Sequence, residues 1–171
     1  MKKLIIFLVA AFGCCFVASL MALIGIGFLA ETHYIPDTEA HPGSELREAD
    51  QAWLRENGIV LEGETVLWFY STGFVSISED GNLFTENAVI SYWEEEGELI
   101  VQAAAFEDIA EIDPAWSDSW LEDSIFTVRT DGDEWFELYV SAENGKDKDF
   151  FRELTLRWQT ARAATPTSGP R

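Results

Sequence analysis

Residues 81–93 read GNLFTENAVISYW, a stretch in which apolar and polar side chains alternate around a Thr-Glu-Asn interruption. Alternation with a period of two is typical of a β-strand that buries one face. The preceding residues, 79–82 (EDGN), have the turn chemistry of a hairpin. The stretch therefore predicts a strand from Leu83 to Trp93 that follows a tight turn.

Similar patterns on both sides of this stretch predict an antiparallel sheet. Short runs rich in β-branched and aromatic residues predict strands at 64–70, 74–78, 98–106, 109–112, 124–130 and 134–142, with a longer loop at 114–123. A final helix is expected over 147–161, because Phe150, Leu154 and Trp158 recur every four residues. The fold class is mainly β with a C-terminal helix, in which the helix covers one face of about seven antiparallel strands.

The order of these elements resembles that of bacterial pleckstrin-homology-like domains, including the related GRAM-type domains. The resemblance covers Ile59 to about Ala161 and rests on two segments. Residues 81–92 are similar to the family pattern g-x-L-x-T-x-x-R-V-I-x-Y, and residues 106–112 (FEDIAEI) to its x-x-D-I-x-x-I segment. The resemblance implies a half-open barrel or sandwich over residues 59–162, with Trp158 directed inward, and no particular reaction. Ala88 stands where the family usually has an arginine.

The N-terminal segment carries no charge from Leu4 to Ala30. At ~1.5 Å per residue such a helix is longer than the ~30 Å hydrocarbon core of a bilayer. We expect residues 1–30 to form a transmembrane helix that is retained as a signal anchor. Lys2 and Lys3 precede the run and acids follow it, so the positive-inside rule places the N-terminus in the cytoplasm and the domain outside a bacterial cell membrane.

Three alternatives concern the same segment. A signal peptide cleaved near residues 25–27 (GIG) would release the domain. Acylation at Cys14 would make a lipoprotein, but apolar residues follow that cysteine. Small residues recur every four positions in this segment, at Ala10, Cys14, Ala18 and Ala22. This spacing allows close packing of membrane helices, so assembly of a membrane complex through this helix is an alternative function.

The segments that flank the domain are polar. Residues 31–58 are expected to form a linker and a short helix that starts at Ser44 and stops at Asn57-Gly58. Residues 163–171 are expected to be a disordered tail.

The part of the chain after Ala30 is strongly acidic. It holds all 31 Asp and Glu residues, and between Glu56 and Glu143 the only Lys or Arg is Arg129. Nucleic acids and anionic lipid headgroups are bound largely through Lys and Arg. This composition excludes nucleic-acid binding, and binding to anionic headgroups is not expected.

No catalytic or metal centre is indicated. The two histidines, His33 and His41, lie in the predicted linker, and no cysteine follows Cys15. A pair of carboxylates is enough for a glycoside hydrolase, so a carboxylate-pair hydrolase is kept as an alternative function. The acidic turns 94–98 and 131–134 offer oxygen ligands to calcium but lack the spacing of an EF-hand. We predict a protein that is not an enzyme and has no cofactor.

Trp116 and Trp120 are the candidates for contact with a partner, because they lie in a predicted loop where a large aromatic side chain has no periodic packing role. Trp68, Trp135 and Trp158 occupy periodic positions and are expected in the core. The sequence thus predicts a membrane-anchored extracytoplasmic binding or scaffolding module that contacts a protein partner.

Overall fold

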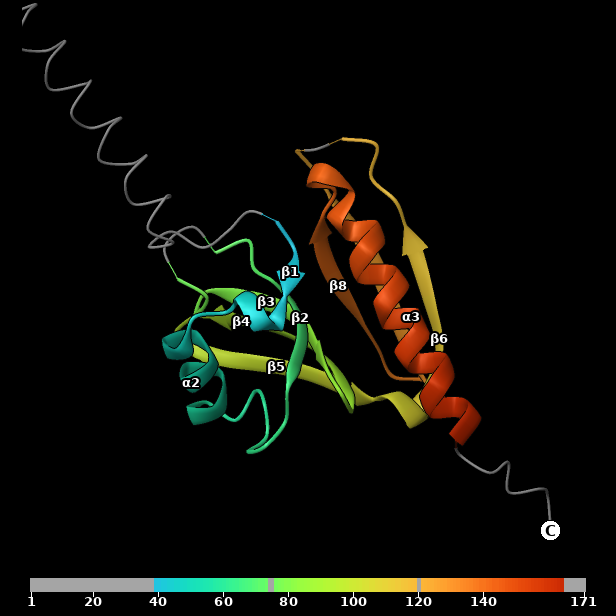
Figure 1. The fold of residues 1–171 in the computed structure, drawn as a ribbon, viewed down its shortest axis with the longest axis horizontal. Coiled ribbons are helices and arrows are strands. Elements are labelled where there is room, and N and C mark those ends of the chain that lie inside the picture. Colours follow the sequence, from blue (N-terminus) through green and yellow to red (C-terminus); the bar gives the residue numbers. More distant parts are fainter. Residues whose placement is uncertain (1–38, 74–75, 120, 165–171) are drawn as a thin grey trace, which may run out of the picture. The chain divides into compact units, whose positions relative to one another are not determined.

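The computed structural model describes residues 39–73, 76–119 and 121–164. Their strands form two antiparallel sheets (Figure 1). The first sheet has the order β1 (His41–Pro42), β2 (Val66–Tyr70), β3 (Asp80–Thr85), β4 (Ala88–Glu95) and β5 (Glu98–Ala105). The second sheet has the order β6 (Ile109–Ala115), β7 (Asp123–Thr130) and β8 (Trp135–Ser141).

Two α-helices and three 3-10 turns complete the described residues. The helices are α2 (Glu48–Glu56) and α3 (Lys146–Ala164), and the 3-10 turns are η1 (Gly43–Glu45), η2 (Phe106–Asp108) and η3 (Glu143–Gly145). The prediction of a mainly β fold with a C-terminal helix is confirmed, in the form of two sheets that do not close into a barrel. Within the described ranges, no helix has the length and apolar character needed to cross a membrane. The predicted anchor, residues 1–30, lies outside them.

The main core lies between the inner faces of the two sheets and α3. Phe84 and Val89 come from the first sheet, Phe126 and Leu138 from the second, and all are fully buried. Phe150 of α3 is fully buried among them and packs edge-to-face on Phe84, with ring centroids 5.0 Å apart. The amphipathic C-terminal helix thus covers the sheets as predicted.

The ring that seals the sheets is not the one expected. Trp158, predicted to point inward, packs against the main core but is only half-buried, whereas Phe150 and Leu154 are fully buried. Trp158 lies one turn further along the helix, where its indole Nε1 donates a hydrogen bond to the Ile109 carbonyl oxygen at 2.9 Å. An indole with a polar partner at the rim is satisfied there without full burial.

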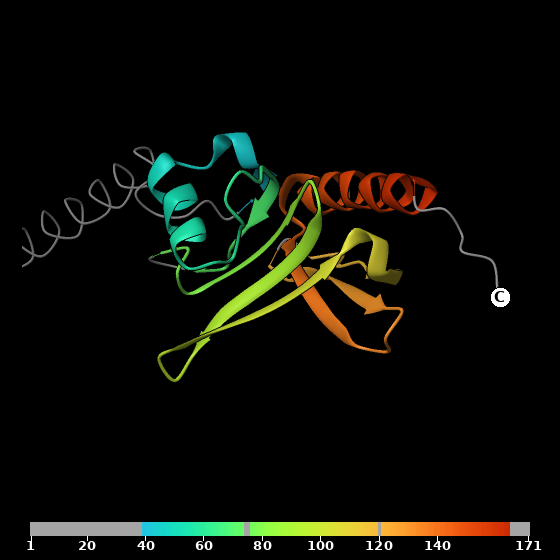
Figure 2. The same ribbon diagram turned by 90° about the horizontal axis from the view of Figure 1, so that it is seen from below.

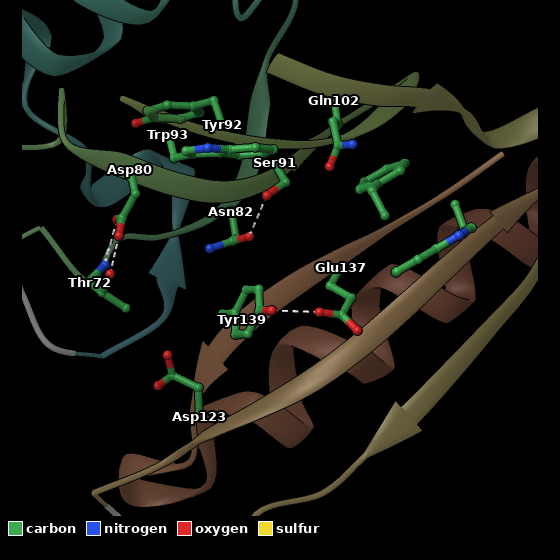
Figure 3. A pocket seen from close by; sticks show the side chains of 12 residues that line it. Thr72, Asp80, Asn82, Ser91, Tyr92, Trp93, Gln102, Asp123, Glu137 and Tyr139 are labelled. Carbon is green, nitrogen blue, oxygen red and sulfur yellow. Dashed lines mark hydrogen bonds between the residues drawn. The ribbon is translucent and has the colours of Figure 1, made fainter. Parts of the chain in front are cut away.

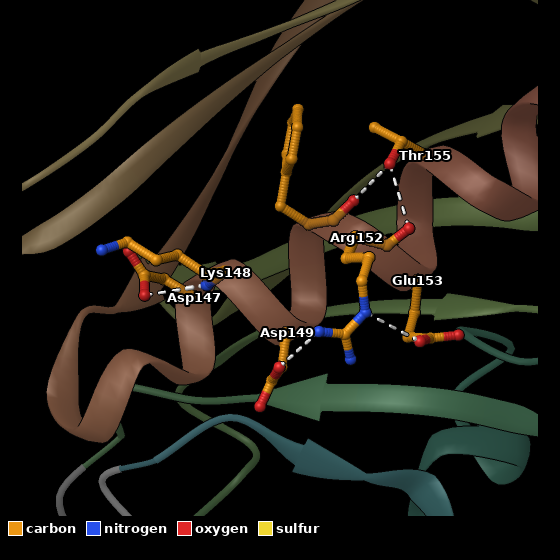
Figure 4. A network of polar contacts seen from close by, with 7 residues as sticks. Asp147, Lys148, Asp149, Arg152, Glu153 and Thr155 are labelled. Atoms are coloured by element: carbon orange, nitrogen blue, oxygen red, sulfur yellow. Dashed lines mark hydrogen bonds and ion pairs between the residues drawn. The ribbon is translucent and has the colours of Figure 1, made fainter.

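The start of α3 is fixed by polar contacts (Figure 4). Asp147 is buried, and its carboxylate accepts hydrogen bonds from the Ser124 hydroxyl (2.7 Å) and the Lys148 backbone N–H (2.8 Å). Arg152 forms ion pairs with Asp149 and Glu153. Asp147 and Asp149 lie in the first turn, where the helix dipole stabilises negative charge. The helix continues to Ala164, two residues into the predicted tail.

A second, smaller core covers the other face of the first sheet. Leu54 of α2 and the following Ile59 and Val60 pack with Leu83, Ile90 and Tyr92 of the sheet. The short helix was predicted from Ser44, but only the 3-10 turn η1 occurs there, and α2 begins at Glu48. His41, predicted to lie in the linker, pairs with Phe69 across β1 and β2.

The hairpin of residues 81–93 differs from its prediction. Glu86 and Asn87 form the turn between β3 and β4, and the Thr85 hydroxyl accepts hydrogen bonds from the N–H groups of Asn87 and Ala88 at 3.1 Å. The Thr-Glu-Asn interruption is therefore the turn. Gly81, predicted in a turn, lies inside β3 opposite Tyr92.

Glycine is required at position 81 because the ring of Tyr92 occupies the space that a side chain would need. A Cβ atom at this position would lie 2.5 Å from the ring of Tyr92, which is buried and donates its hydroxyl to the Ile77 carbonyl oxygen at 2.7 Å. The predicted strand at 74–78 is wrong for its described residues, since 76–78 contain a turn between β2 and β3. Conversely, the strand predicted at 109–112 extends to Ala115, which shortens the loop expected at 114–123.

Candidate binding groove between the two sheets

The inner face of the first sheet changes from apolar to polar along its strands. Side chains two residues apart share a face, so paired residues form rows across the sheet. One row lies in or against the main core and consists of Trp68, Phe84, Val89 and Ala104. The next row consists of Tyr70, Asn82, Ser91 and Gln102, and the one after it contains Asp80, Trp93 and Ile100. The polar rows lie toward the β4–β5 turn, where the hairpin projects past the second sheet (Figure 2).

A groove of about 590 Å³ lies against these polar rows, with β8 as its opposite wall (Figure 3). Five of its lining residues are aromatic, namely Tyr92, Trp93, Trp135, Phe136 and Tyr139, of which Tyr92 and Phe136 are buried in the two cores. Three are acidic, namely Asp80, Asp123 and Glu137, and the other four are Thr72, Asn82, Ser91 and Gln102. Among the residues that the structure describes, no Lys, Arg or His lines the groove, so it combines aromatic surface with negative charge.

The wall formed by β8 follows from a strict alternation. Phe136, Leu138 and Val140 are buried in the main core, so the residues between them face away from it. Trp135, predicted to be in the core, is 60% exposed for this reason, and Tyr139 is 41% exposed.

Glu137 and Tyr139 are joined on this outward face. The Tyr139 hydroxyl donates a hydrogen bond to Glu137 Oε2 at 2.5 Å. This bond and the negative charge of Glu137 raise the pKa of Tyr139 above its ordinary value. The wall thus holds a carboxylate beside two exposed aromatic rings.

Asp80 fixes the loop that follows β2. Its Oδ1 atom accepts hydrogen bonds from the Ser71 hydroxyl (3.0 Å) and from the backbone N–H groups of Thr72 (2.8 Å) and Gly73 (3.1 Å). Its Oδ2 atom accepts a further bond from the Thr72 hydroxyl. Both oxygens are engaged in shaping the rim of the groove, so the role of this carboxylate is structural.

Tyr70 and Asp123 link the two sheets at the end of the groove. The Tyr70 hydroxyl donates a hydrogen bond to Asp123 Oδ1 at 2.9 Å. Burial raises the pKa of Asp123, the nearby charge of Asp80 raises it further, and the bond from Tyr70 partly opposes both. Burial and the two carboxylates also raise the pKa of Tyr70.

A second cleft continues the groove along the edges of both sheets. It is lined by Val101, Gln102 and Ala103 of β5, by Trp135 and Phe136 of β8, and by Thr130, Asp133 and Glu134 of the β7–β8 hairpin. In the part of the chain that the structure describes, β5 pairs only with β4 and β8 only with β7. The groove is therefore flanked by two open strand edges.

The predicted contact residue Trp116 lies at a different place. It follows β6, is 43% exposed, and packs edge-to-face on Phe126 and Phe151 with centroids 5.4 and 5.1 Å away. It therefore covers part of the core and presents its remaining surface to solvent. Trp120 lies outside the described residues, as do the predicted membrane-packing residues Ala10, Cys14, Ala18 and Ala22.

The acidic turns considered for calcium do not bring metal ligands together. Glu96 and Asp133 adopt positive φ angles in the two turns, as tight hairpins require. Across residues 39–73, 76–119 and 121–164, no group of three or more His, Cys, Asp or Glu side chains has the arrangement of a metal site.

Sequence reasoning did not find the groove. The available signals were polar residues at inward positions of β3, β4 and β5, and exposed aromatic residues at alternate positions of β8. Each signal is weak alone, because a sequence does not show which strands of one sheet extend past the edge of the other.

No protein-family model matches this chain, and no curated protein matches it. Among solved structures, it is similar to a DUF1696 family protein with a pleckstrin-homology domain from Shewanella loihica PV-4, at 14% identity and a TM-score of 0.47 over 74% of this chain and 99% of that one. The C-terminal domain of an unknown protein from Leishmania infantum matches at 17% identity and a TM-score of 0.46 over 64% and 97% of the two chains. A pleckstrin homology domain from Shewanella amazonensis SB2B matches at 14% identity and a TM-score of 0.45 over 66% and 97%.

Proposed function

We propose that this chain is a membrane-anchored extracytoplasmic binding or scaffolding module with a pleckstrin-homology-like domain, and that the groove beside β8 holds a protein partner. One observation carries the proposal. The groove presents aromatic and acidic side chains, contains no base, and is flanked by two open strand edges. Exposed aromatic rings supply much of the binding free energy at protein interfaces, and open strand edges supply main-chain hydrogen bonds.

A protein partner is favoured over an anionic lipid. The loop after β2 is organised by the carboxylate of Asp80, and Ala88 stands at the start of β4 where the resembling family usually has an arginine. Each Lys or Arg near a membrane surface contributes ~1 kcal/mol of attraction to anionic lipids, and this groove offers none.

Binding is also favoured over hydrolysis by a carboxylate pair. Of the three acids in the groove, Asp80 has both oxygens engaged by the loop, Asp123 accepts from Tyr70, and Glu137 accepts from Tyr139. A hydrolase needs one carboxylate free to attack or to activate water. Trp116, which is partly used by the core, is a second candidate contact, together with Trp120.

The anchor and the export of the domain rest on the sequence of residues 1–30 and on the charges that flank it. An alkaline phosphatase fused after Arg171 is expected to be active and to remain in the membrane fraction. An inactive fusion would reverse the proposed orientation, and an active but soluble, shortened product would show that the anchor is cleaved.

Site-specific photo-crosslinking in cells tests the partner site. A photoreactive benzoylphenylalanine at Trp135 is expected to form a covalent adduct with another protein. The same group at Leu61, which is 66% exposed and follows α2, serves as the matched control and is expected to form none. Equal adducts from both positions, or none from Trp135, would contradict the assignment of the groove.

A further inference from the structure

We infer that the segment bound in the groove is an extended, basic polypeptide strand that adds to the free edge of β5 and directs Lys or Arg side chains toward β8. This inference rests on the proposed function and specifies the chemistry of the partner. It follows from the edge of β5, the charge of the groove and the exposed rings of β8.

The edge of β5 lacks the protection that edge strands usually carry. Natural edges are blunted by charged residues, prolines, bulges or very short strands. Residues 99–105 (LIVQAAA) contain no charge and no proline, and β5 pairs with β4 over eight consecutive residues without a register shift. Such an edge presents alternate N–H and C=O groups on its open side.

The other edges of the two sheets each carry a protective feature, and β8, which also flanks the groove, carries the charge of Glu137. β1 has two residues, one of which is Pro42. β6 contains Glu111, Asp113 and Pro114 and has a register shift after Ile109. The contrast identifies β5 as the edge that is suited to accept a further strand.

The charge of the groove selects a cation. Asp80, Asp123 and Glu137 line the groove, and Asp133 and Glu134 line the cleft beside β5. Within the described part of the chain, neither lining contains a Lys, Arg or His, so an incoming carboxylate or phosphate would face five negative side chains and no positive one. Opposite potentials across an interface also speed association and reject like-charged competitors.

The aromatic wall favours a flat cation with an apolar neighbour. Trp135 is 60% exposed and lines the cleft, and Val101, on the opposite face of β5 from Gln102, is 42% exposed. A guanidinium group stacks on an exposed indole through a cation–π contact. In an added strand, alternate side chains face opposite ways, so a sequence that alternates basic and apolar residues presents its bases to one wall.

The test uses the full chain in detergent micelles and fluorescence anisotropy with a labelled ten-residue peptide that alternates Arg and Val. We expect this peptide to bind at least ~100-fold more tightly than its Glu-Val counterpart, since each well-placed charge pair changes affinity severalfold. Two further peptides carry N-methyl groups on one or the other set of alternate backbone nitrogens. We expect the peptide whose methylated nitrogens face β5 to bind at least ~10-fold more weakly, since it lacks those main-chain donors.

Two variants locate the binding. Gln102→Lys places a base on the groove face of β5 and is expected to weaken Arg-Val binding at least ~10-fold through like-charge repulsion. Leu61→Lys adds the same charge at an exposed position after α2 and is expected to change the affinity less than ~2-fold, because Leu61 lines neither the groove nor the cleft.

The outcomes separate this inference from the proposed function. Equal binding of the Glu-Val peptide, full competition by spermidine at matched charge, or tolerance of N-methylation in both registers would refute an added basic strand. If no peptide binds but the adduct at Trp135 forms in cells, the inference fails and the proposed function stands. If the adduct is also missing, the proposed function fails as well.

Discussion

Replacing Phe150 with alanine removes the side chain that fills the space between the two sheets. Phe150 is fully buried, packs edge-to-face on Phe84 at 5.0 Å, and stacks on Phe126 at 6.2 Å. Its ring also meets Trp68 edge-to-face at 6.1 Å. Because these partners belong to both sheets, the neighbouring backbone is not free to collapse into the space that the ring leaves.

The structure sets the size of the effect. Truncation of a fully buried Phe to Ala costs ~3–5 kcal/mol, of which the cavity contributes a part that depends on relaxation. For a domain of this size the loss corresponds to a fall in Tm of about 10–20 °C. Trp158→Ala is expected to cost less, about 1–3 kcal/mol, because Trp158 is half-buried and loses one hydrogen bond to Ile109.

The assay is equilibrium denaturation of the full chain by urea, followed by tryptophan fluorescence and far-UV circular dichroism. Leu156→Ala is the matched control in the same helix, since Leu156 is 58% exposed and its truncation should change stability by less than ~0.5 kcal/mol. A loss below ~1 kcal/mol for Phe150→Ala, or a larger loss for Trp158→Ala, would refute the proposed packing of α3.

Three further substitutions test the groove and its support. Gly81→Ala should destabilise the domain by about 1–3 kcal/mol, because the new Cβ meets the ring of Tyr92 at 2.5 Å; a neutral effect in urea denaturation would contradict this contact. Burial raises the pKa of Asp123 above its ordinary value of 3.8, so the native chain binds the carboxyl proton more tightly than the unfolded chain does. Stability is therefore lost as pH rises from 3.8 through the folded-state pKa. Asp123→Asn should therefore gain stability relative to the wild type between pH 3 and pH 7, and a relative loss would contradict a raised pKa for Asp123. Trp135→Ala should change stability by less than ~0.5 kcal/mol, because the ring is 60% exposed; a larger loss in thermal unfolding would make it a core residue after all.

The order of strands and the final helix could be predicted from the sequence because each depends on local periodicity. The run 135–141 (WFELYVS) alternates clearly and forms β8 as expected. Periodicity does not say which of two aromatic faces is covered. Trp135 and Phe136 look equally suited to a core, and only the packing against the first sheet and α3 decides that Phe136 is buried.

Two local errors also have tertiary causes. Gly81-Asn82 has good turn chemistry, but the buried ring of Tyr92 uses the glycine as space inside a strand. His41-Pro42 looks like a linker, but the edge of β2 pairs with it. The groove could not be predicted for the same reason, since it exists where the first sheet extends past the second and its lining comes from strands distant in sequence.

The most direct test of the binding groove is amide hydrogen exchange of the full chain with and without the Arg-Val peptide. We expect slower exchange in residues 99–105 of β5 when the peptide is bound, because an added strand protects the N–H groups of its open edge. Residues 109–115 of β6, whose edge is protected by charge and proline, should exchange at an unchanged rate. Protection of β6, of the Trp116 loop, or of no segment at saturating peptide would contradict the assignment of β5 as the docking edge.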